Sequence, residues 1–452
     1  MKKRENFSGR AAVIMAMAGS AIGLGNIWRF PYLVGQNGGA AFVVIYIVFT
    51  LLLSLPIFLA ESVIGRRSGT NSRSAIGALV PGRAGRWFGM LTVLTPLWIL
   101  SYYSVVGGWS LEYLLQACRL DYIHLSPAEV SGSFARFVSN PWQPLLFHWL
   151  FLSATAGIVL FGVKSGIEKF SKFAIPLLFV LVLVIMFYSL SLPGSMEGVS
   201  YLVVPDFSKV TGHTFVDALG QSFYSLSLGM GIVITYSSYV SKQENLMVTG
   251  FGTSVCDLLF AYLAGFAIMP AVFAAGIAPG SGPGLIFDTL PYIFAQMGLE
   301  SPVLSSLAAI LFFLTILFAA LTSSVSLMEV GVAYITERRG WSRRAACLAL
   351  LLGCGVLGSF AALSFGPLAG VKLFNLPLFD FADSFASNVL LMVGGVICVV
   401  LAGWVMPRKA VFSELTNGGS LRRNVKLFPL VYFLLRYLAP LGILAMILSL
   451  VL

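Results

Sequence analysis

The sequence predicts an all-α polytopic membrane protein with eleven transmembrane helices. Of its 452 residues, 58% are hydrophobic and only 10% are charged, whereas soluble domains average about 25% charged residues. Eleven apolar stretches each approach or exceed the ~20 residues that a helix needs to cross the hydrocarbon core. The 36 phenylalanines and 8 tryptophans exclude a disordered chain, which carries few aromatic residues.

The predicted spans follow one another along almost the whole chain. They cover residues 11–36, 41–64, 87–117, 145–162, 170–191, 215–240, 245–278, 302–336, 344–361, 379–405 and 428–451. A basic N-terminal tail, 1–10, runs straight into the first span, which is longer than the apolar region of a cleaved signal peptide. Residues 283–300 are amphipathic and too broken to span, so we expect a helical loop there.

Lysine and arginine are distributed unevenly between the two sides of the predicted spans. With the N-terminus in the cytoplasm, the inner segments hold 22 of them and the outer segments hold 4. Because cytoplasmic loops are enriched in these residues, the bias predicts a cytoplasmic N-terminus and, after eleven spans, an outer C-terminus. The net charge of +10 is then a sign of membrane topology rather than of nucleic-acid binding. Five scattered cysteines and three distant histidines give no disulfide framework and no metal motif.

The first and sixth spans are interrupted near their midpoints by glycines and small polar residues. The first contains Gly19-Ser20-Ala21-Ile22-Gly23-Leu24-Gly25-Asn26, and the sixth contains Ser225-Leu226-Ser227-Leu228-Gly229-Met230-Gly231. Glycine weakens a helix and polar groups oppose insertion. Gly19 and Gly23 form a GxxxG pattern typical of close helix packing, but packing alone does not require the polar residues.

The two breaks lie five spans apart, which is informative because five is odd. The chain divides into the tail 1–10, a first five-helix half 11–191, a second half 215–405 and an eleventh helix 428–451. Because the first half contains an odd number of spans, the second half enters the membrane inverted relative to the first. Broken helices at corresponding positions of inverted halves indicate a transporter with a binding site near the midplane.

Further polar residues lie within the seventh and eighth predicted spans. Thr322, Ser323 and Ser324 form a hydroxyl cluster, for which bonding back to their own helix is the simpler explanation. Asp257 is harder to explain structurally, because an intramembrane carboxylate is unfavourable and is functional by default. Hydroxyl, amide, carboxylate and carbonyl oxygens together favour an alkali cation over zinc or copper.

These motifs resemble those of the neurotransmitter:sodium symporter family over nearly the whole chain. Residues 19–39 (GSAIGLGNIWRFPYLVGQNGG) are similar to the family's first-helix signature, 220–229 (GQSFYSLSLG) to its sixth-helix motif and 321–324 (LTSS) to its eighth. Eleven helices look like the shorter bacterial members. The resemblance implies a five-plus-five inverted repeat, with helices 1 and 6 unwound at mid-membrane, that works by alternating access.

The resemblance also implies two sodium sites, a substrate site and two gates. The first sodium site would use the Ala21 carbonyl, Asn26, Ser225 and Asp257, completed by the substrate's carboxylate. The second would use the carbonyls of Gly19, Ile22 and Ala319 and the hydroxyls of Thr322 and Ser323. Substrate would contact Leu24, Gly25, Ile99, Tyr103, Tyr224, Ser225, Ser227, Met230, Ser323 and Leu327. Arg29 with Asp383 matches the outer gate, and Arg4 with Glu337, near Tyr239, matches the inner gate; a lone charge near a span end can instead snorkel to the interface.

Two positions depart from the family pattern. Residue 257, commonly Asn in the family, is Asp here, and chloride-dependent members carry a Ser where this chain has Ala261. We therefore expect Asp257 to supply the negative charge that chloride supplies elsewhere, since unpaired buried cations are unfavourable.

Biogenic-amine members carry an Asp at the position of Gly23, so glycine favours a substrate with its own carboxylate. Met230 adds an adaptable wall, and we expect a large apolar or aromatic amino acid.

The sequence thus predicts a sodium-coupled amino-acid symporter of a bacterial-type plasma membrane, with two sodium ions and no chloride requirement. A proton-coupled permease of the same fold is the nearest alternative, and a substrate sensor on a transporter scaffold is another. Without a nucleophile–base pair, metal motif or phosphate loop, nothing indicates an enzyme. The expected partners are a small-molecule amino acid and the lipid bilayer.

Overall fold

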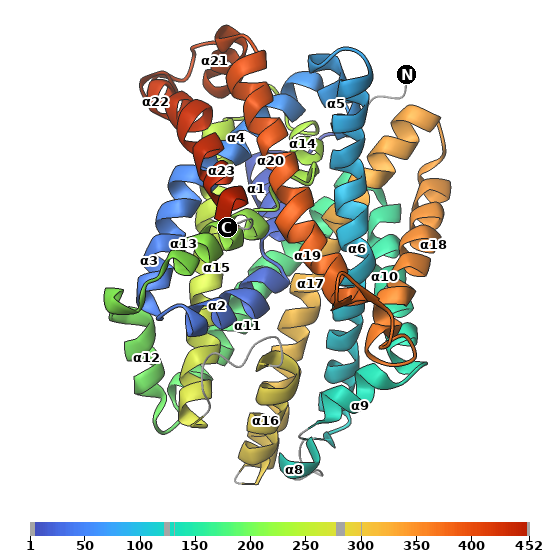
Figure 1. The fold of residues 1–452 in the computed structure, drawn as a ribbon, viewed down its shortest axis with the longest axis vertical. Coiled ribbons are helices and arrows are strands. Elements are labelled where there is room, and N and C mark those ends of the chain that lie inside the picture. Colours follow the sequence, from blue (N-terminus) through green and yellow to red (C-terminus); the bar gives the residue numbers. More distant parts are fainter. Residues whose placement is uncertain (1–4, 122–126, 131, 277–284, 300, 450–452) are drawn as a thin grey trace.

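The computed structural model describes residues 5–121, 127–130, 132–276, 285–299 and 301–449, and this part of the chain is nearly all helical (Figure 1). Its one β-element is an antiparallel hairpin in which Lys372–Leu373 (β1) pairs with Leu376–Pro377 (β2). The helical content agrees with the all-α prediction.

The helices are numbered in chain order, and η marks a 3-10 or π-helical stretch. Up to residue 190 they are α1 (Arg10–Ala21), η1 (Gly25–Arg29), α2 (Phe30–Gln36), α3 (Ala40–Phe49), η2 (Thr50–Ser54), α4 (Leu55–Ser68), α5 (Ser72–Leu79), α6 (Arg83–Cys118), α8 (Pro127–Val130), α9 (Ser133–Ser139), α10 (Gln143–Leu160), η3 (Val163–Glu168) and α11 (Lys169–Leu190). Beyond it they are α12 (Ser195–Val203), η4 (Phe207–Lys209), α13 (Gly212–Ser225), α14 (Ile232–Ser237), α15 (Leu246–Ala274), η5 (Leu285–Thr289), α16 (Leu290–Gly298), α17 (Pro302–Arg339), α18 (Arg343–Ala362), η6 (Leu363–Phe365), α19 (Leu378–Phe385), η7 (Ala386–Leu390), α20 (Leu391–Val400), η8 (Leu401–Val405), α21 (Arg408–Thr416), α22 (Arg422–Phe433), η9 (Leu434–Leu438) and α23 (Ala439–Ser449).

Nine helices in the described chain are long and apolar enough to cross a membrane, and a tenth span results if the bent pair Arg10–Ala21 and Gly25–Gln36 is counted as one. The nine are Ala40–Ser68, Arg83–Cys118, Gln143–Leu160, Val163–Leu190, Leu246–Ala274, Pro302–Arg339, Arg343–Phe365, Leu378–Val405 and Arg422–Leu448. The remaining predicted span, 215–240, is divided between the short helices α13 and α14. The described chain therefore has nine or ten candidate spans, and the count of eleven stays a prediction.

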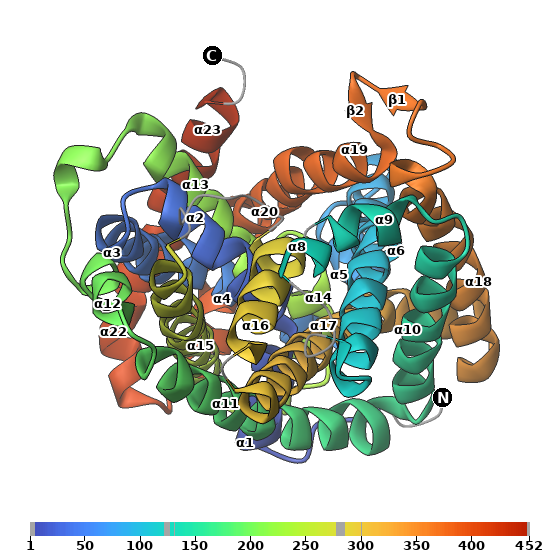
Figure 2. The same ribbon diagram turned by 90° about the horizontal axis from the view of Figure 1, so that it is seen from below.

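The broken helices pack against several continuous ones. α17 lies along α6, and α10 and α18 pack against α6. α1 contacts α11, α15 and α17, while α14 packs on α4. Seen from below, α10 and α18 lie on one side and α3, α12 and α22 on the other, with α14 and α17 between them (Figure 2). Any site formed by the broken helices is thus enclosed by continuous ones.

The two ends of the molecule differ in charge. α5 and α21 lie at one end of Figure 1, and α8, α12 and α16 lie at the other. The segments rich in lysine and arginine, such as 66–86 and 408–426, belong to the first end. This grouping supports the predicted sidedness, although the orientation of the termini relative to a membrane remains a prediction.

An ion-pair cluster, in which Arg66 and Glu414 are buried and Lys242 is exposed, connects three segments at this end. Glu414 of α21 accepts hydrogen bonds from Arg66 Nε and Lys242 Nζ, each 2.8 Å long. Burial alone would raise the pKa of Glu414, but the hydrogen bonds and charges of Lys242 and Arg66 outweigh it and hold that pKa below its usual value. Arg66 also donates to the Glu244 carbonyl at 2.6 Å. The loop that follows α14 is therefore anchored to α4 and α21.

Candidate functional site

The first break in the helices follows Ala21, where α1 ends. Ile22 is extended, with ψ of 101°, and the helical stretches before and after the break are inclined by 54°. Gly23 faces the hydroxyls of two other helices, because a Cβ there would lie 2.4 Å from Ser323 Oγ and 3.0 Å from Tyr103 OH. Residue 23 must therefore be glycine for these side chains to occupy their positions.

The second break separates α13, which ends at Ser225, from α14, which begins at Ile232. Three residues between them have positive φ: Ser227 (55°), Gly229 (77°) and Gly231 (70°). A Cβ on Gly229 would lie 2.1 Å from the Leu391 carbonyl, so this position requires glycine for space as well as for its backbone conformation. The break leaves backbone groups without helical partners, which are tolerated at membrane depth only inside protein or beside a cavity.

Glu61 of α4 compensates part of the second break. Its Oε1 accepts a hydrogen bond from the Gly229 N–H at 2.7 Å, and the side chain is fully buried. The Glu61 contact is thus with the backbone of the break. This agrees with a structural role.

Asp257 of α15 is the centre of a buried polar cluster beside both breaks. The Ser225 hydroxyl donates to its two carboxylate oxygens at 2.7 and 2.8 Å. Asn26 Nδ2 donates to Asp257 Oδ1 at 2.8 Å, and Tyr46 OH donates to Asp257 Oδ2 at 3.3 Å. The Asn26 Oδ1 atom accepts from the Gly23 N–H at 3.2 Å. Three predicted members of the first sodium site, Asn26, Ser225 and Asp257, therefore lie in mutual contact and are almost completely buried.

The hydroxyls of α17 form a second cluster against the first break. Thr322 Oγ1 donates to the Ile22 carbonyl at 3.2 Å and to the Ala319 carbonyl at 2.9 Å. Ser323 Oγ donates to the Ser20 carbonyl at 3.1 Å and to the Ile22 carbonyl at 3.4 Å. A Cβ on Gly19 would lie 3.5 Å from Thr322 Cβ. The five residues predicted for the second sodium site are thus neighbours, and their hydroxyl and carbonyl oxygens are the hard ligands that an alkali cation prefers.

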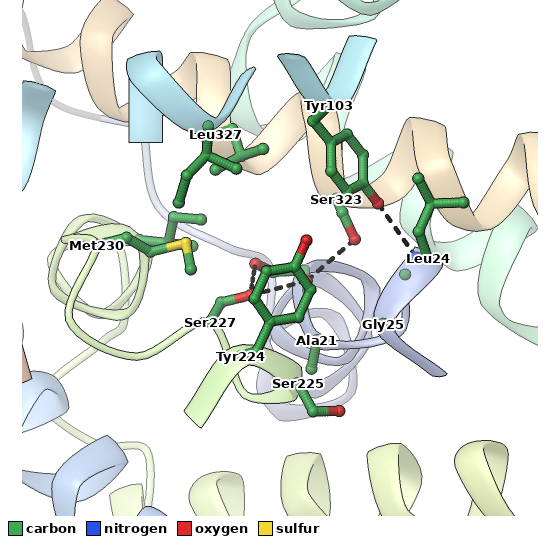
Figure 3. Close-up of a pocket in the computed structure, with 14 residues that line it drawn as sticks. Ala21, Leu24, Gly25, Tyr103, Tyr224, Ser225, Ser227, Met230, Ser323 and Leu327 are labelled. Atoms are coloured by element: carbon green, nitrogen blue, oxygen red, sulfur yellow. Dashed lines mark hydrogen bonds between the residues drawn. The ribbon is translucent and has the colours of Figure 1, made fainter. Parts of the chain in front are cut away.

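A cavity lies between these two clusters. Its lining contains all ten residues predicted to contact substrate, together with Ser20, Ala21, Gly23 and Ile232. Figure 3 shows Tyr103 and Leu24 on one side of it, Met230 and Leu327 on another, and Tyr224 near the centre. That these residues bind a substrate remains a prediction.

The cavity has a polar and an apolar part. On the polar side, Tyr103 OH accepts a hydrogen bond from the Leu24 N–H at 3.2 Å, and Ser227 Oγ donates to the Ser20 carbonyl at 3.0 Å. The side chains of Ile99, Met230 and Leu327 supply an apolar wall. Such a pocket suits a molecule with one polar end and one apolar end.

The residues predicted as gates are placed as follows. The Arg29 guanidinium lies 5.2 Å from the centre of the Tyr224 ring, and within the described chain no ion pair of 4.0 Å or less joins it to Asp383, which is exposed. At the other end, Glu337 accepts two 2.8 Å hydrogen bonds from Asn71. Arg4 lies outside the described residues.

Tyr239, which was expected near the inner gate, contacts a buried carboxylate that the sequence analysis did not single out, Glu329. Its hydroxyl donates to Glu329 Oε1 at 2.8 Å, and Arg343 pairs with the same carboxylate through both terminal nitrogens. Glu329 is fully buried. The rule that identified Asp257, an intramembrane carboxylate within an apolar span, applies equally to Glu329. Two residues that line the cavity were also missed. Ser20 lies inside the first glycine motif, which could have indicated it, whereas Ile232 carries no chemical signal.

The known proteins that this chain resembles are transporters. The model of the sodium:neurotransmitter symporter family matches residues 4–126 and 130–452. An uncharacterized sodium-dependent transporter of Bacillus subtilis strain 168, YhdH, is 37% identical over 452 residues, covering 100% of this chain and 98% of its own. The sodium-dependent serotonin transporter of Drosophila melanogaster is 26% identical over 423 residues, covering 83% of this chain and 67% of its own. The crystal structure of MhsT in complex with L-phenylalanine is similar with a TM-score of 0.90 and 41% identity, covering 99% of this chain and 100% of its own.

Proposed function

The chain belongs to the sodium:neurotransmitter symporter family, and from that premise we propose that it is a sodium-coupled symporter of amino acids across the plasma membrane. Sodium-dependent transport is the activity of the family. The cargo, the two-ion stoichiometry, the independence from chloride and the individual site residues are the content of the proposal.

One observation supports the proposal above the others: the cavity shares a wall with each oxygen cluster. Ser225 lines the cavity and also donates to Asp257. Ser323 lines the cavity and also contacts the carbonyls at the first break. A substrate in the cavity and cations at the clusters would therefore order the same side chains. Such shared contacts are what coupling between two ligands requires.

The mixed polar and apolar lining of the cavity supports a large apolar or aromatic amino acid. The substrate's carboxylate would lie near Ala21 and Ser225 and complete the first sodium shell, while Tyr103 would donate to it. An apolar side chain would lie against Met230 and Leu327. The space around Gly23 leaves no room for a carboxylate of the protein's own, which argues for a zwitterionic substrate over a monoamine. The L-phenylalanine bound to the similar MhsT agrees with this class.

The buried Asp257 supports independence from chloride. Its carboxylate lies beside Tyr46 and Ser225, where a positive ion would otherwise need an external anion. Inward movement of two sodium ions with a zwitterion carries two positive charges. The free energy that the membrane potential supplies is then about 4.6 kcal/mol per 100 mV. The membrane potential alone could thus drive accumulation.

Alternating access would open the cavity to each side in turn. We propose Arg29 and Asp383 as the outer gate and Arg4 and Glu337 as the inner gate. The halves 11–191 and 215–405 would move as inverted repeats. A cytoplasmic N-terminus follows from the distribution of lysine and arginine.

The proposal is tested by binding of radiolabelled L-phenylalanine and L-leucine to the purified protein. We expect saturable binding in sodium, its loss in potassium, and equal binding in sodium chloride and sodium gluconate. Ser323→Ala should weaken the dependence on sodium, whereas Ser306→Ala, a buried serine on the same helix but outside the cavity, should not. Equal binding in sodium and potassium would instead favour a proton-coupled permease.

A further inference from the structure

Cations and aromatic rings gather where η8 ends beside η9. The Arg436 guanidinium lies 4.5 Å from the centre of the Trp404 ring and 5.6 Å from that of Tyr437. The guanidiniums of Arg408 and Arg436 also lie near the Tyr432 ring, at 5.5 and 6.0 Å from its centre. These five residues are called the arginine–aromatic cluster below. None of them lines the central cavity.

The two positive charges of this cluster lack a counter-charge within the described chain. No carboxylate there lies within 4.0 Å of Arg408 or Arg436. Glu414 is the only acidic residue between positions 404 and 440, and it is already bound by two other cations, Arg66 and Lys242. The positive charge of both guanidiniums is therefore left for an external anion.

The cluster is held at the level where the chain leaves a membrane span. Tyr432 OH donates to the Gly403 carbonyl at 3.1 Å, and Trp404 Nε1 donates to the Arg436 carbonyl at 3.1 Å. Gly403 lies two residues before η8 ends at Val405, which is within one helical turn of about 5.4 Å. Tryptophan and tyrosine are enriched at the membrane–water interface. The guanidiniums are therefore positioned at headgroup depth, on the side predicted to be cytoplasmic.

An exposed apolar stripe leads from the cluster along the last helix. Its members, spaced three or four residues apart, are each 44–61% exposed: Phe433, Tyr437, Leu441, Leu444 and Leu448. Residues at this spacing share one face of a helix. The span Arg422–Leu448 is also the least buried of the candidate spans, at 28%. This face is open to the acyl chains of a lipid whose headgroup lies at the cluster.

We propose that the arginine–aromatic cluster binds the headgroup of an anionic phospholipid, with its phosphate between Arg408 and Arg436 and its acyl chains along the exposed stripe. Arginine binds phosphate oxygens through two parallel N–H groups. Basic sites between transmembrane helices on the cytoplasmic side are suited to anionic headgroups. An arginine that only snorkels to the interface would show no preference between anionic and zwitterionic lipids, so the two explanations differ in a measurable way.

The first experiment measures the melting temperature of the purified full-length protein in detergent with increasing lipid. Phosphatidylglycerol should raise it at lower concentration than phosphatidylcholine does. Arg408→Gln and Arg436→Gln should each weaken this preference about fivefold and the double variant about thirtyfold, as expected for two cations near a membrane surface. Arg83→Gln is the matched control, since Arg83 is an exposed arginine on the same predicted side and its loss should leave the preference unchanged.

Three outcomes would overturn the proposal: equal effects of both lipids on the wild type, an equal loss in Arg83→Gln, or full stabilisation by inorganic phosphate alone, which would indicate a small-anion site. A second measurement does not depend on folding of the arginine variants. The fluorescence that disappears in Trp404→Phe should be quenched more strongly by brominated phosphatidylglycerol than by brominated phosphatidylcholine. Equal quenching by the two lipids would also contradict the site.

Discussion

Replacing Asp257 by asparagine removes one negative charge from the proposed first sodium site with almost no change of shape. Asp257 is fully buried and accepts hydrogen bonds from Ser225, Asn26 and Tyr46. Asparagine keeps an oxygen ligand, so the main loss is the attraction between the carboxylate and sodium. At a separation of about 4 Å and an effective dielectric constant of about 20, that attraction is about 4 kcal/mol.

This magnitude predicts a large shift in the sodium dependence of binding. An energy of 4 kcal/mol corresponds to about a thousandfold change in affinity, and we treat this as an upper bound because the amide oxygen still coordinates. We expect the sodium concentration for half-maximal L-phenylalanine binding to rise by about ten- to a thousandfold in Asp257→Asn. Asp206→Asn, which changes an exposed loop aspartate, should leave it unchanged.

The assay is a sodium titration at fixed amino-acid concentration, with ionic strength balanced by potassium. Gel filtration and melting temperature establish that both variants are folded. A folded Asp257→Asn protein whose sodium titration lies within about twofold of the wild type would refute the electrostatic role of this carboxylate. A loss of wild-type binding when gluconate replaces chloride would refute it independently.

Substitutions at three further positions test other parts of the structure. Gly23→Ala should abolish amino-acid binding, because its Cβ would lie 2.4 Å from Ser323 Oγ; unchanged affinity would mean that this part of the cavity is not used. Glu61→Ala should cost about 1–3 kcal/mol of stability by leaving the Gly229 N–H unpaired, whereas Glu61→Gln should lower the melting temperature less. The pKa of Glu414 is lowered in the folded protein, so its contribution to stability is present above the unfolded pKa of about 4.3 and is lost as pH falls through the folded pKa. The melting temperature of Glu414→Gln should therefore decrease less steeply than that of the wild type as pH falls below about 4.5. The same decrease in both proteins would contradict this.

The motif residues could be located from the sequence because their chemistry is unusual in a membrane. Glycines and small polar residues at mid-span, and a carboxylate at 257, are unfavourable there unless they serve a site. The structure brings Asn26, Ser225 and Asp257 into contact although they lie on three separate segments. The resemblance to a family supplied this pairing, since spacing alone does not fix which helices meet.

Other features depend on long-range packing that no local pattern encodes. Ile232 lines the cavity only because the chain turns at Gly231, so its hydrophobic side chain gave no signal. The contact between Glu414 and Arg66 joins residues 348 positions apart. The sixth predicted span shows a further limit: its glycines and small polar residues predict an interruption near the midpoint, but hydropathy does not give the bounds of the two short helices on either side of it.

The central claim is that an inward sodium gradient drives an amino acid across the membrane, and uptake into liposomes tests it most directly. The purified protein would be reconstituted, and a radiolabelled amino-acid mixture would be added outside with either sodium or potassium. The account predicts accumulation above the outside concentration with sodium only, led by a large apolar or aromatic amino acid when the contents are separated by chromatography. Equal uptake under sodium and potassium gradients would contradict it.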